Sequence, residues 1–412
     1  MTGQTVPFHE GLWYVTGVFS TPRRPTASRI AEGSGHYGQQ QEEHMKGRVV
    51  VCKEYSKPFV IEEYDVPEPA PGAVILRMTQ AGVCGSDLHT WRGDQNQENL
   101  PIPPTGRAMG HEGAGVVEIL GDGIETDSAG EPIKKGDRVI YAAVFPCYHC
   151  RQCLKGNTNW CMNRNYPAAG VWPYFVATYS DYLYLPPRHP FFKVPDELDD
   201  NILGPVNCAM GTVTTGLIRA QAGEGDYVVI QGAGGLGIHA TAMAKEMGAD
   251  RVIVIDRLEN RLRLAEEFGA DHTINIEEFN TPETRLQRVR ELTDDRGADV
   301  VMELVGRAEL LKEGIDMLSN GGTFVEIGDI VRGREVSIDP SKLLTGKNIV
   351  GSLMYKPELL PRLLNFLVRK QDVLPFDKIV SHTFPLAEVN EAFAQSEWDQ
   401  SQTPITRAML VP

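Results

Sequence analysis

The chain has 412 residues, enough for two or three domains, and a hydrophobic fraction of 42% that suits a globular protein with a core. Its 55 acidic and 40 basic residues give a net charge of −15, which argues against nucleic-acid binding, because such proteins carry a basic face. The sequence shows neither an apolar run of about 18 residues nor a secretory leader. We therefore expect a cytoplasmic protein without membrane contact. In that compartment clustered cysteines are interpreted as metal ligands in preference to disulfides.

The first 45 residues differ in composition from the rest of the chain. Residues 21–41 are rich in Pro, Ser, Gly, Gln and Arg and show little apolar periodicity. This pattern predicts a disordered N-terminal extension over residues 1–45. An arm that packs on a partner subunit is the alternative.

The remaining elements fall into two patterns. Up to about residue 205, short β-type runs are broken by glycine and proline, as in an all-β core, and the clearest runs are 48–52, 72–77, 115–119 and 137–140. From residue 225, apolar strands alternate with helices: strands at 227–231, 251–256, 298–305 and 323–327, helices at 236–247 and 259–268. Such alternation indicates an α/β fold with a doubly wound parallel sheet covered on both faces. A long helix is predicted at 357–370.

A glycine-rich turn opens the first of these helices. Gly232-Ala233-Gly234-Gly235-Leu236-Gly237 has the spacing GxGxxG, follows a predicted strand, and precedes Asp256 at the end of the next strand. In such turns Gly232 allows the tight bend, Gly234 lets a pyrophosphate approach the backbone, and Gly237 lets helix and strand pack closely. The helix N-terminus adds free N–H groups. The pattern therefore favours dinucleotide binding, and a glycine-rich turn that binds no ligand is the less favoured alternative.

Asp256 bears on which dinucleotide binds. Its carboxylate would accept hydrogen bonds from the ribose hydroxyls and repel a 2′-phosphate, which favours NAD over NADP. Arg257 and Arg261 could neutralise such a phosphate, so NADP stays open.

Four cysteines lie close together in a loop spanning residues 145–163. Cys147, Cys150, Cys153 and Cys161 form C-x2-C-x2-C-x7-C, which suits a closed tetrahedral zinc site that stabilises a loop without a core of its own. An iron–sulfur cluster is the alternative, but the loop has no electron-transfer context. We expect a structural zinc.

A second, dispersed set of ligand-type residues consists of Cys84, His111 with Glu112, and Cys208. A catalytic zinc needs three protein ligands and an exchangeable position. The segment Gly110-His111-Glu112-x2-Gly115-x5-Gly121, together with the four-cysteine lobe, resembles the zinc-dependent alcohol dehydrogenases of the medium-chain dehydrogenase/reductase superfamily. The resemblance runs from about Met45 to the C-terminus.

The resemblance implies roles for individual residues. Cys84, His111 and Cys208 match catalytic zinc ligands, and Glu112 matches a neighbouring carboxylate that ligates zinc directly or transiently in some members. Asp87 matches a carboxylate that orients the ligating histidine. Ser86 and His89 match the hydroxyl and the imidazole of the proton relay. Thr212 and Arg407 match positions that contact nicotinamide and pyrophosphate. Gly232, Gly234, Gly235, Leu236, Gly237, Asp256, Arg257 and Arg261 complete the expected cofactor site.

The implied architecture is a mainly-β GroES-like catalytic domain at 46–205 and 352–412 and a Rossmann-type NAD-binding domain at 206–351. The implied reaction is the NAD-linked oxidation of an alcohol, by hydride transfer from an alkoxide held at zinc with a Ser/His proton relay, and its reverse. Two zinc ions per chain, one catalytic and one structural, and a homodimer or homotetramer are expected.

The substrate is less constrained by the sequence. Ala143 stands where several primary-alcohol enzymes carry a bulky aromatic residue, which favours a secondary or bulky alcohol. The aromatic stretch at 166–185 either packs in strands or lines the substrate pocket. Polyol, amino-alcohol or phosphonate-type substrates, the last met by Arg107, stay open, as does a non-catalytic NAD-binding scaffold.

Overall fold

The computed structural model describes residues 45–94, 101–163, 175–328, 330–397 and 405–412. The extension predicted over residues 1–45 therefore lies outside the described residues, apart from Met45. Along the described part of the chain, no helix combines the length and the apolar character needed to cross a bilayer.

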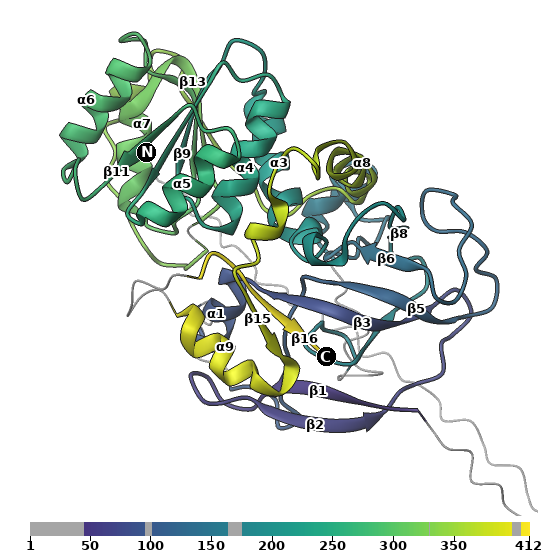
Figure 1. The fold of residues 1–412 in the computed structure, drawn as a ribbon. Helices are drawn as coiled ribbons and strands as arrows, with labels where there is room; N and C mark the ends of the chain where they lie inside the picture. Colours follow the sequence, from purple (N-terminus) through teal and green to yellow (C-terminus); the bar gives the residue numbers. More distant parts are fainter. Residues whose placement is uncertain (1–44, 95–100, 164–174, 329, 398–404) are drawn as a thin grey trace, which may run out of the picture. The chain divides into compact units, whose positions relative to one another are not determined.

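A parallel sheet runs in the order β11-β10-β9-β12-β13-β14 (Figure 1). The strands are β9 (Tyr227–Gln231), β10 (Arg251–Asp256), β11 (His272–Asn275), β12 (Ala298–Glu303), β13 (Leu318–Glu326) and β14 (Asn348–Gly351). The order reverses between β9 and β12, and in such sheets the crevice outside the carboxyl ends at this point receives the ligand.

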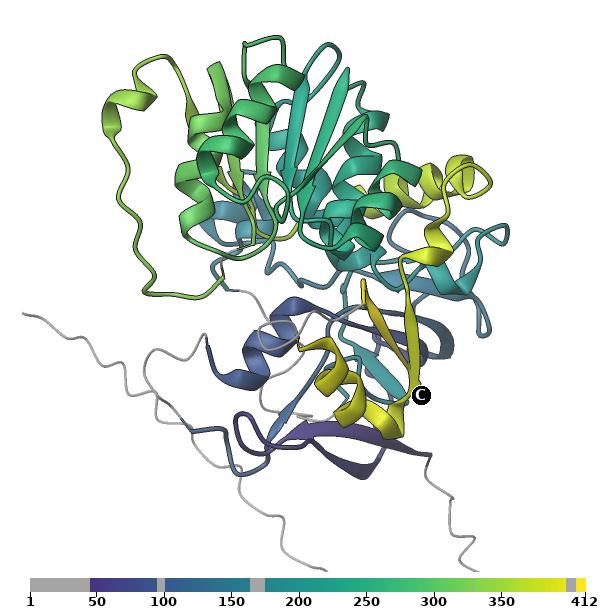
Figure 2. The same ribbon diagram turned by 60° about the vertical axis from the view of Figure 1, so that its left-hand side comes forward.

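Helices cover both faces of the sheet (Figures 1 and 2), which explains why its central strands are continuous apolar runs. On β9, Ile230 packs into one core with Leu217 and Ala240. The preceding residue, Val229, points to the opposite face and packs into a second core with Val289 and Ile315. The helices concerned are α3 (Gly211–Ala220), α4 (Gly235–Glu246) and α5 (Glu259–Glu267) on the first face and α6 (Pro282–Leu292) and α7 (Glu309–Met317) on the second.

The second part of the described chain is mainly β and is organised around β3 (Val74–Val83). This strand pairs antiparallel with β5 (Ala114–Leu120), β7 (Tyr182–Leu185) and the C-terminal β16 (Ala408–Val411). The other strands of this mainly-β part are β1 (Lys46–Cys52), β2 (Val60–Asp65), β4 (Arg107–Ala108), β6 (Arg138–Tyr141), β8 (Phe191–Lys193) and β15 (His382–Pro385). Because Ala408 pairs with Val83, the chain end places Arg407 beside the residue that follows β3, Cys84.

The remaining helices complete the described structure. The α-helices are α1 (Gly85–Arg92), α2 (Arg151–Leu154), α8 (Leu360–Lys370) and α9 (Val389–Ser396). One π-helical turn, η3 (Val206–Met210), leads directly into α3, and π-helical turns are frequent at functional sites. The 3-10 turns are η1 (Thr158–Trp160), η2 (Asp200–Ile202), η4 (Pro340–Leu343), η5 (Pro357–Leu359), η6 (Phe376–Lys378) and η7 (Leu386–Glu388).

The predicted fold class, a doubly wound parallel sheet with a mainly-β second part, is confirmed. The strand predicted at 298–305 ends earlier, at Glu303, because this side chain accepts hydrogen bonds from the N–H groups of Val305 and Gly306 and so turns the chain. The helix predicted at 357–370 is a 3-10 turn followed by α8. The predicted domain boundaries stay predictions.

Candidate active site

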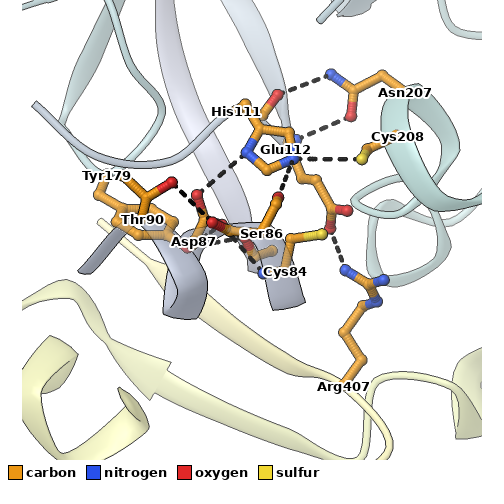
Figure 3. A network of polar contacts seen from close by, with 12 residues as sticks. Cys84, Ser86, Asp87, Thr90, His111, Glu112, Tyr179, Asn207, Cys208 and Arg407 are labelled. Atoms are coloured by element: carbon orange, nitrogen blue, oxygen red, sulfur yellow. Dashed lines mark hydrogen bonds and ion pairs between the residues drawn. The ribbon is translucent and has the colours of Figure 1, made fainter. Parts of the chain in front are cut away.

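Cys84, His111, Glu112 and Cys208 come together from three segments far apart in the chain (Figure 3). Cys84 precedes α1, His111 and Glu112 lie in the turn before β5, and Cys208 lies in η3. One ligand atom from each residue lies within 4.8 Å of all the others, and His111 Nε2 is 3.2 Å from Cys208 Sγ. Two thiols, an imidazole and a carboxylate in this arrangement form a donor set that zinc prefers.

The imidazole of His111 is oriented by a buried carboxylate. Asp87 Oδ1 lies 3.1 Å from His111 Nδ1, and Asp87 Oδ2 accepts hydrogen bonds from the Tyr179 hydroxyl (2.7 Å) and the Cys84 N–H (3.1 Å). A carboxylate can only accept, so Nδ1 carries the proton and Nε2 is left facing the two cysteines. The hydrogen bond from His111 Nδ1 to Asp87 therefore fixes the tautomer in which Nε2 can bind a metal.

The two thiols interact directly. The hydrogen bond between them lowers the pKa of Cys84 well below that of an ordinary thiol and raises the pKa of Cys208 well above it. One of the two sulfurs is therefore favoured as a thiolate, the form that binds metal.

Glu112 forms a buried ion pair with Arg407. Glu112 Oε2 contacts Arg407 Nη1, and the two residues are 0% and 4% exposed. Burial raises the pKa of Glu112 to about 7, against the opposing effect of Arg407. Within the described residues, Glu112 Oε1 and Arg407 Nε have no hydrogen-bond partner, so both groups keep capacity for a further ligand.

Arg407 also reaches the start of α4. A Cβ on Gly235 would lie 2.8 Å from Arg407 Nε, so the side chain passes directly over this glycine. The guanidinium therefore lies between Glu112 and the N-terminus of α4.

The glycine turn has the geometry that its spacing predicts. Gly232 has φ of 104°, a left-handed conformation that favours glycine, and Gly234 is the N-cap of α4. Asp256 Oδ2 accepts a hydrogen bond from the Ala233 N–H at 2.7 Å, and Oδ1 accepts one from the Leu258 N–H at 2.9 Å. The carboxylate is thus held beside the turn.

The two neighbouring arginines have partners within the protein. Arg261 Nη2 donates to the Ile405 carbonyl at 2.7 Å, and Arg257 Nε lies 4.0 Å from Glu277. Burial lowers the pKa of Arg261.

A cavity of about 1350 Å³ joins the cysteine–histidine cluster to the glycine turn. Most of the predicted catalytic and cofactor residues line it: Cys84, Ser86, His89, His111, Cys208, Thr212, Gly232, Gly234, Gly235, Leu236, Asp256, Arg257, Arg261 and Arg407. Glu112, Asp87 and Gly237 are not among its lining residues, and Glu112 and Asp87 lie buried behind it. A space of this size suits a dinucleotide together with a small substrate.

Ser86 and His89 lie on α1 at the metal end of this cavity. Ser86 Oγ is 3.4 Å from His111 Nε2, and His89 is 8% exposed. Their hydroxyl and imidazole are groups that can accept and release protons.

The four-cysteine loop forms a second cluster. Its sulfur atoms lie within 4.8 Å of one another, with Cys150 Sγ 3.6 Å from Cys153 Sγ. The N–H groups of Cys153 and Met162 lower the pKa of the Cys150 thiol to about 6. Cys147 N–H also donates to Cys161 Sγ at 3.2 Å. Donors aimed at sulfur stabilise thiolates, so the loop fits a closed zinc site.

Three residues behind the site were not singled out for it from the sequence. Tyr179 holds Asp87, as described above. The side-chain Oδ1 of Asn207 accepts a hydrogen bond from the Gly113 N–H at 3.1 Å, and the backbone carbonyl of Asn207 accepts one from the Tyr355 hydroxyl. The same hydroxyl accepts from the Ala143 N–H at 3.1 Å, so Tyr355 connects Ala143 to the residue before Cys208. The position of Asn207 next to Cys208 was the available signal.

The remaining substrate hypotheses fall on several positions. Arg107 is exposed on β4 and is not among the cavity-lining residues. Residues 166–174 lie outside the described part. Of the described aromatic residues in this stretch, Phe175 and Tyr179 are fully buried, Phe175 packs with Val49 and Ile75, and neither lines the cavity.

Comparison with known proteins identifies related sequences and structures. Residues 70–196 match the family model described as alcohol dehydrogenase GroES-like domain, and residues 235–369 match the one described as zinc-binding dehydrogenase. The chain is 34% identical to 5-exo-hydroxycamphor dehydrogenase of Pseudomonas putida over 337 residues, which cover 81% of the chain and 91% of that protein. It is 29% identical to L-threonine 3-dehydrogenase of Shewanella baltica, over 80% of the chain and 91% of that protein. The crystal structure of an alcohol dehydrogenase from Thermotoga maritima is similar with a TM-score of 0.81 and 30% identity, covering 89% of this chain and all of that one.

Proposed function

We propose that this chain, which belongs to the zinc-dependent alcohol dehydrogenases of the medium-chain dehydrogenase/reductase superfamily, oxidises a secondary or bulky alcohol with NAD and catalyses the reverse reduction. One observation carries this proposal. A single cavity has the Cys84, His111 and Cys208 cluster and the glycine turn in its wall. A metal-held alcohol and a dinucleotide can therefore meet in the same space.

Cys84, His111 and Cys208 would hold the catalytic zinc, with Glu112 beside them, and the four-cysteine loop would hold the structural one. Zinc at the first site, when bound, supplies a Lewis acid that lowers the pKa of an alcohol hydroxyl. Asp87 keeps His111 in the tautomer that presents Nε2.

The proton of the substrate hydroxyl passes to this chain's own groups. The Ser86 hydroxyl accepts it on oxygen and gives up its own proton in exchange, and His89 carries that proton on towards solvent. In the reverse direction the same two residues return the proton to the product oxygen. The dinucleotide supplies the hydride acceptor, and the glycine turn, Arg407 and Asp256 hold it by its pyrophosphate and ribose.

Two observations support a bulky or secondary alcohol. Ala143 is not among the cavity-lining residues, but its N–H is linked through the Tyr355 hydroxyl to the backbone carbonyl of Asn207, the residue before Cys208, so a small residue lies directly behind the metal cluster. Leu88, Leu353 and Met354 add apolar surface to the cavity. The relative named as a 5-exo-hydroxycamphor dehydrogenase supports the same substrate class.

A panel of alcohols tests the proposal. The zinc-loaded protein is offered ethanol, linear and cyclic secondary alcohols and polyols, each with NAD and NADP, and reduced cofactor is read by absorbance. We expect the highest kcat/KM for cyclic secondary alcohols with NAD. Ala143→Phe should lose the cyclic substrates and keep ethanol, which serves as the internal control for folding. A preference of the unaltered protein for ethanol would contradict the proposed substrate class, and NAD binding without any turnover would favour a scaffold.

An amino alcohol is the second candidate, because the chain also resembles the relative named L-threonine 3-dehydrogenase. Inclusion of threonine in the same panel separates the two candidates.

We also propose that the protein forms a homodimer or homotetramer through the edge of its parallel sheet. β14 is the last strand of the sheet, and Ile349 on it is 40% exposed. An edge strand offers N–H and C=O groups for pairing with a second copy. Light scattering should give at least twice the chain mass of 45.5 kDa, and Ile349→Lys should lower it. A monomer in the unaltered protein would contradict this arrangement.

A further inference from the structure

We propose that Asp94 is a positioning residue for the proton relay: it holds His89 so that one defined ring nitrogen receives the proton. This inference rests on the proposed function, because His89 enters it as the relay histidine. Asp94 lies just beyond α1 and outside the cavity wall, and it acts on the reaction through His89.

The end of α1 brings the carboxylate to the imidazole. Gly93 is the C-cap and has φ of 81°, a left-handed conformation that reverses the chain and favours glycine. The Asp94 N–H then donates to the His89 carbonyl at 3.0 Å. The side chain folds back as well, and Asp94 Oδ2 lies 2.7 Å from His89 Nδ1.

The environment makes this contact more than a surface pair. The His89 side chain is 10% exposed and that of Asp94 is 29% exposed, so the hydrogen bond is shielded on the histidine side. Arg92 Nη1 lies 3.7 Å from the same carboxylate oxygen, and Arg92 is itself paired with Glu397 next to α9. The carboxylate is thus held from two sides.

The chemistry of the pair assigns the tautomer of His89. A carboxylate has acceptors and no donor, so Nδ1 must carry the hydrogen of this bond. Nε2 is then the nitrogen that carries no hydrogen and has the basic lone pair, and His89 lines the cavity together with Ser86. When Nε2 takes up the substrate-derived proton, the imidazole becomes a cation with two N–H groups. A charge-assisted hydrogen bond to Asp94 stabilises that cation until a proton leaves to solvent.

The experiment uses the full-length, zinc-loaded enzyme and measures the single-turnover rate of NADH formation, so that product release does not mask the relay. Asp94→Ala should lower this rate by about tenfold, a tenth or less of what a general base contributes. Zinc content and the Kd for NAD should not change. Asp94→Asn keeps the shape of the side chain, and its rate should lie between those of Asp94→Ala and the unaltered enzyme. This variant replaces Asp94→Ala in the test if the alanine variant does not fold. Asp65→Ala, an exposed carboxylate on β2, is the matched control and should retain the full rate.

Two readouts separate positioning from a structural role. Formate should restore part of the rate of Asp94→Ala, because it supplies the missing carboxylate, whereas chloride at equal ionic strength should not. The double variant of His89→Ala and Asp94→Ala should be as slow as His89→Ala and no slower, because Asp94 acts through the imidazole.

An unchanged rate in Asp94→Ala and Asp94→Asn, or full additivity in the double variant, would overturn this inference and leave the proposed function intact. An unchanged rate in His89→Ala would overturn the relay itself, and the inference with it.

Discussion

Gly234 and Gly237 stand three residues apart, at the N-cap and in the first turn of α4, yet alanine should affect different properties at the two positions. A Cβ on Gly237 would overlap the Gly232 carbonyl oxygen and lie 2.8 Å from its carbonyl carbon. Carbon atoms in contact rest about 3.5–4.0 Å apart, so α4 would have to move away from β9 by roughly 1 Å. Overpacking costs about 1–3 kcal/mol, and because the obstacle is backbone we expect the upper end for Gly237→Ala.

Gly234 lies in open space by the same criterion. A Cβ there meets nothing within 4 Å, and its φ of −72° and ψ of −170° suit alanine. Gly234→Ala should therefore leave the free energy of unfolding within about 0.5 kcal/mol of the unaltered protein. Its methyl group would instead stand where the pyrophosphate approaches the backbone. Loss of one charge-assisted hydrogen bond, about 1.5–3 kcal/mol, should weaken NAD binding at least tenfold.

Denaturant titration and NAD titration, followed by intrinsic fluorescence, measure the two effects separately. Gly237→Ala should lose stability, and Gly234→Ala should lose cofactor affinity at normal stability. Equal stability of Gly237→Ala and the unaltered protein would refute the packing argument. Unchanged NAD affinity in Gly234→Ala would refute the placement of the pyrophosphate at this turn.

Three further predictions concern the metal and cofactor sites. Arg407→Met should lower the free energy of unfolding by about 3–5 kcal/mol, because it leaves the buried Glu112 carboxylate without its partner; adding Glu112→Gln should recover part of this loss, and a stability unaffected by Arg407→Met would contradict the argument. Cys153→Ser should reduce the metal content from two zinc ions per chain to one and lower the thermal midpoint, as read by elemental analysis and calorimetry, whereas two retained ions would exclude the lobe as a zinc site. Asp256→Gly should raise the ratio of kcat/KM for NADP to that for NAD by about tenfold, equivalent to about 1.4 kcal/mol; an unchanged ratio would show that this carboxylate does not select the cofactor.

The sequence alone determined the features whose parts are neighbours in the chain. The strands predicted at 227–231 and 251–256 have these bounds in the structure, because an apolar run with turn residues at both ends is a local signal. The glycine turn follows from spacing for the same reason. The four cysteines of the lobe lie within 15 residues, so closing one loop brings their sulfurs together.

The tertiary structure decided the features whose parts are distant in sequence. Glu112 and Arg407 are 295 positions apart and meet because β16 pairs with β3. Tyr179 reaches Asp87 across 92 positions, and Tyr355 reaches Ala143 across 212. The type of a residue and its spacing from its neighbours in sequence do not predict such a partner, because strand pairing and helix packing determine which distant side chains meet.

Asp94 illustrates the limit at short range. It stands five positions from His89, yet their contact depends on the left-handed turn at Gly93 and on the burial of the imidazole. The sequence therefore determined which chemical groups this protein carries and their order. The packing of β3, β16 and η3 decided which of those groups act on one another, because only a closed core brings distant segments within hydrogen-bonding distance.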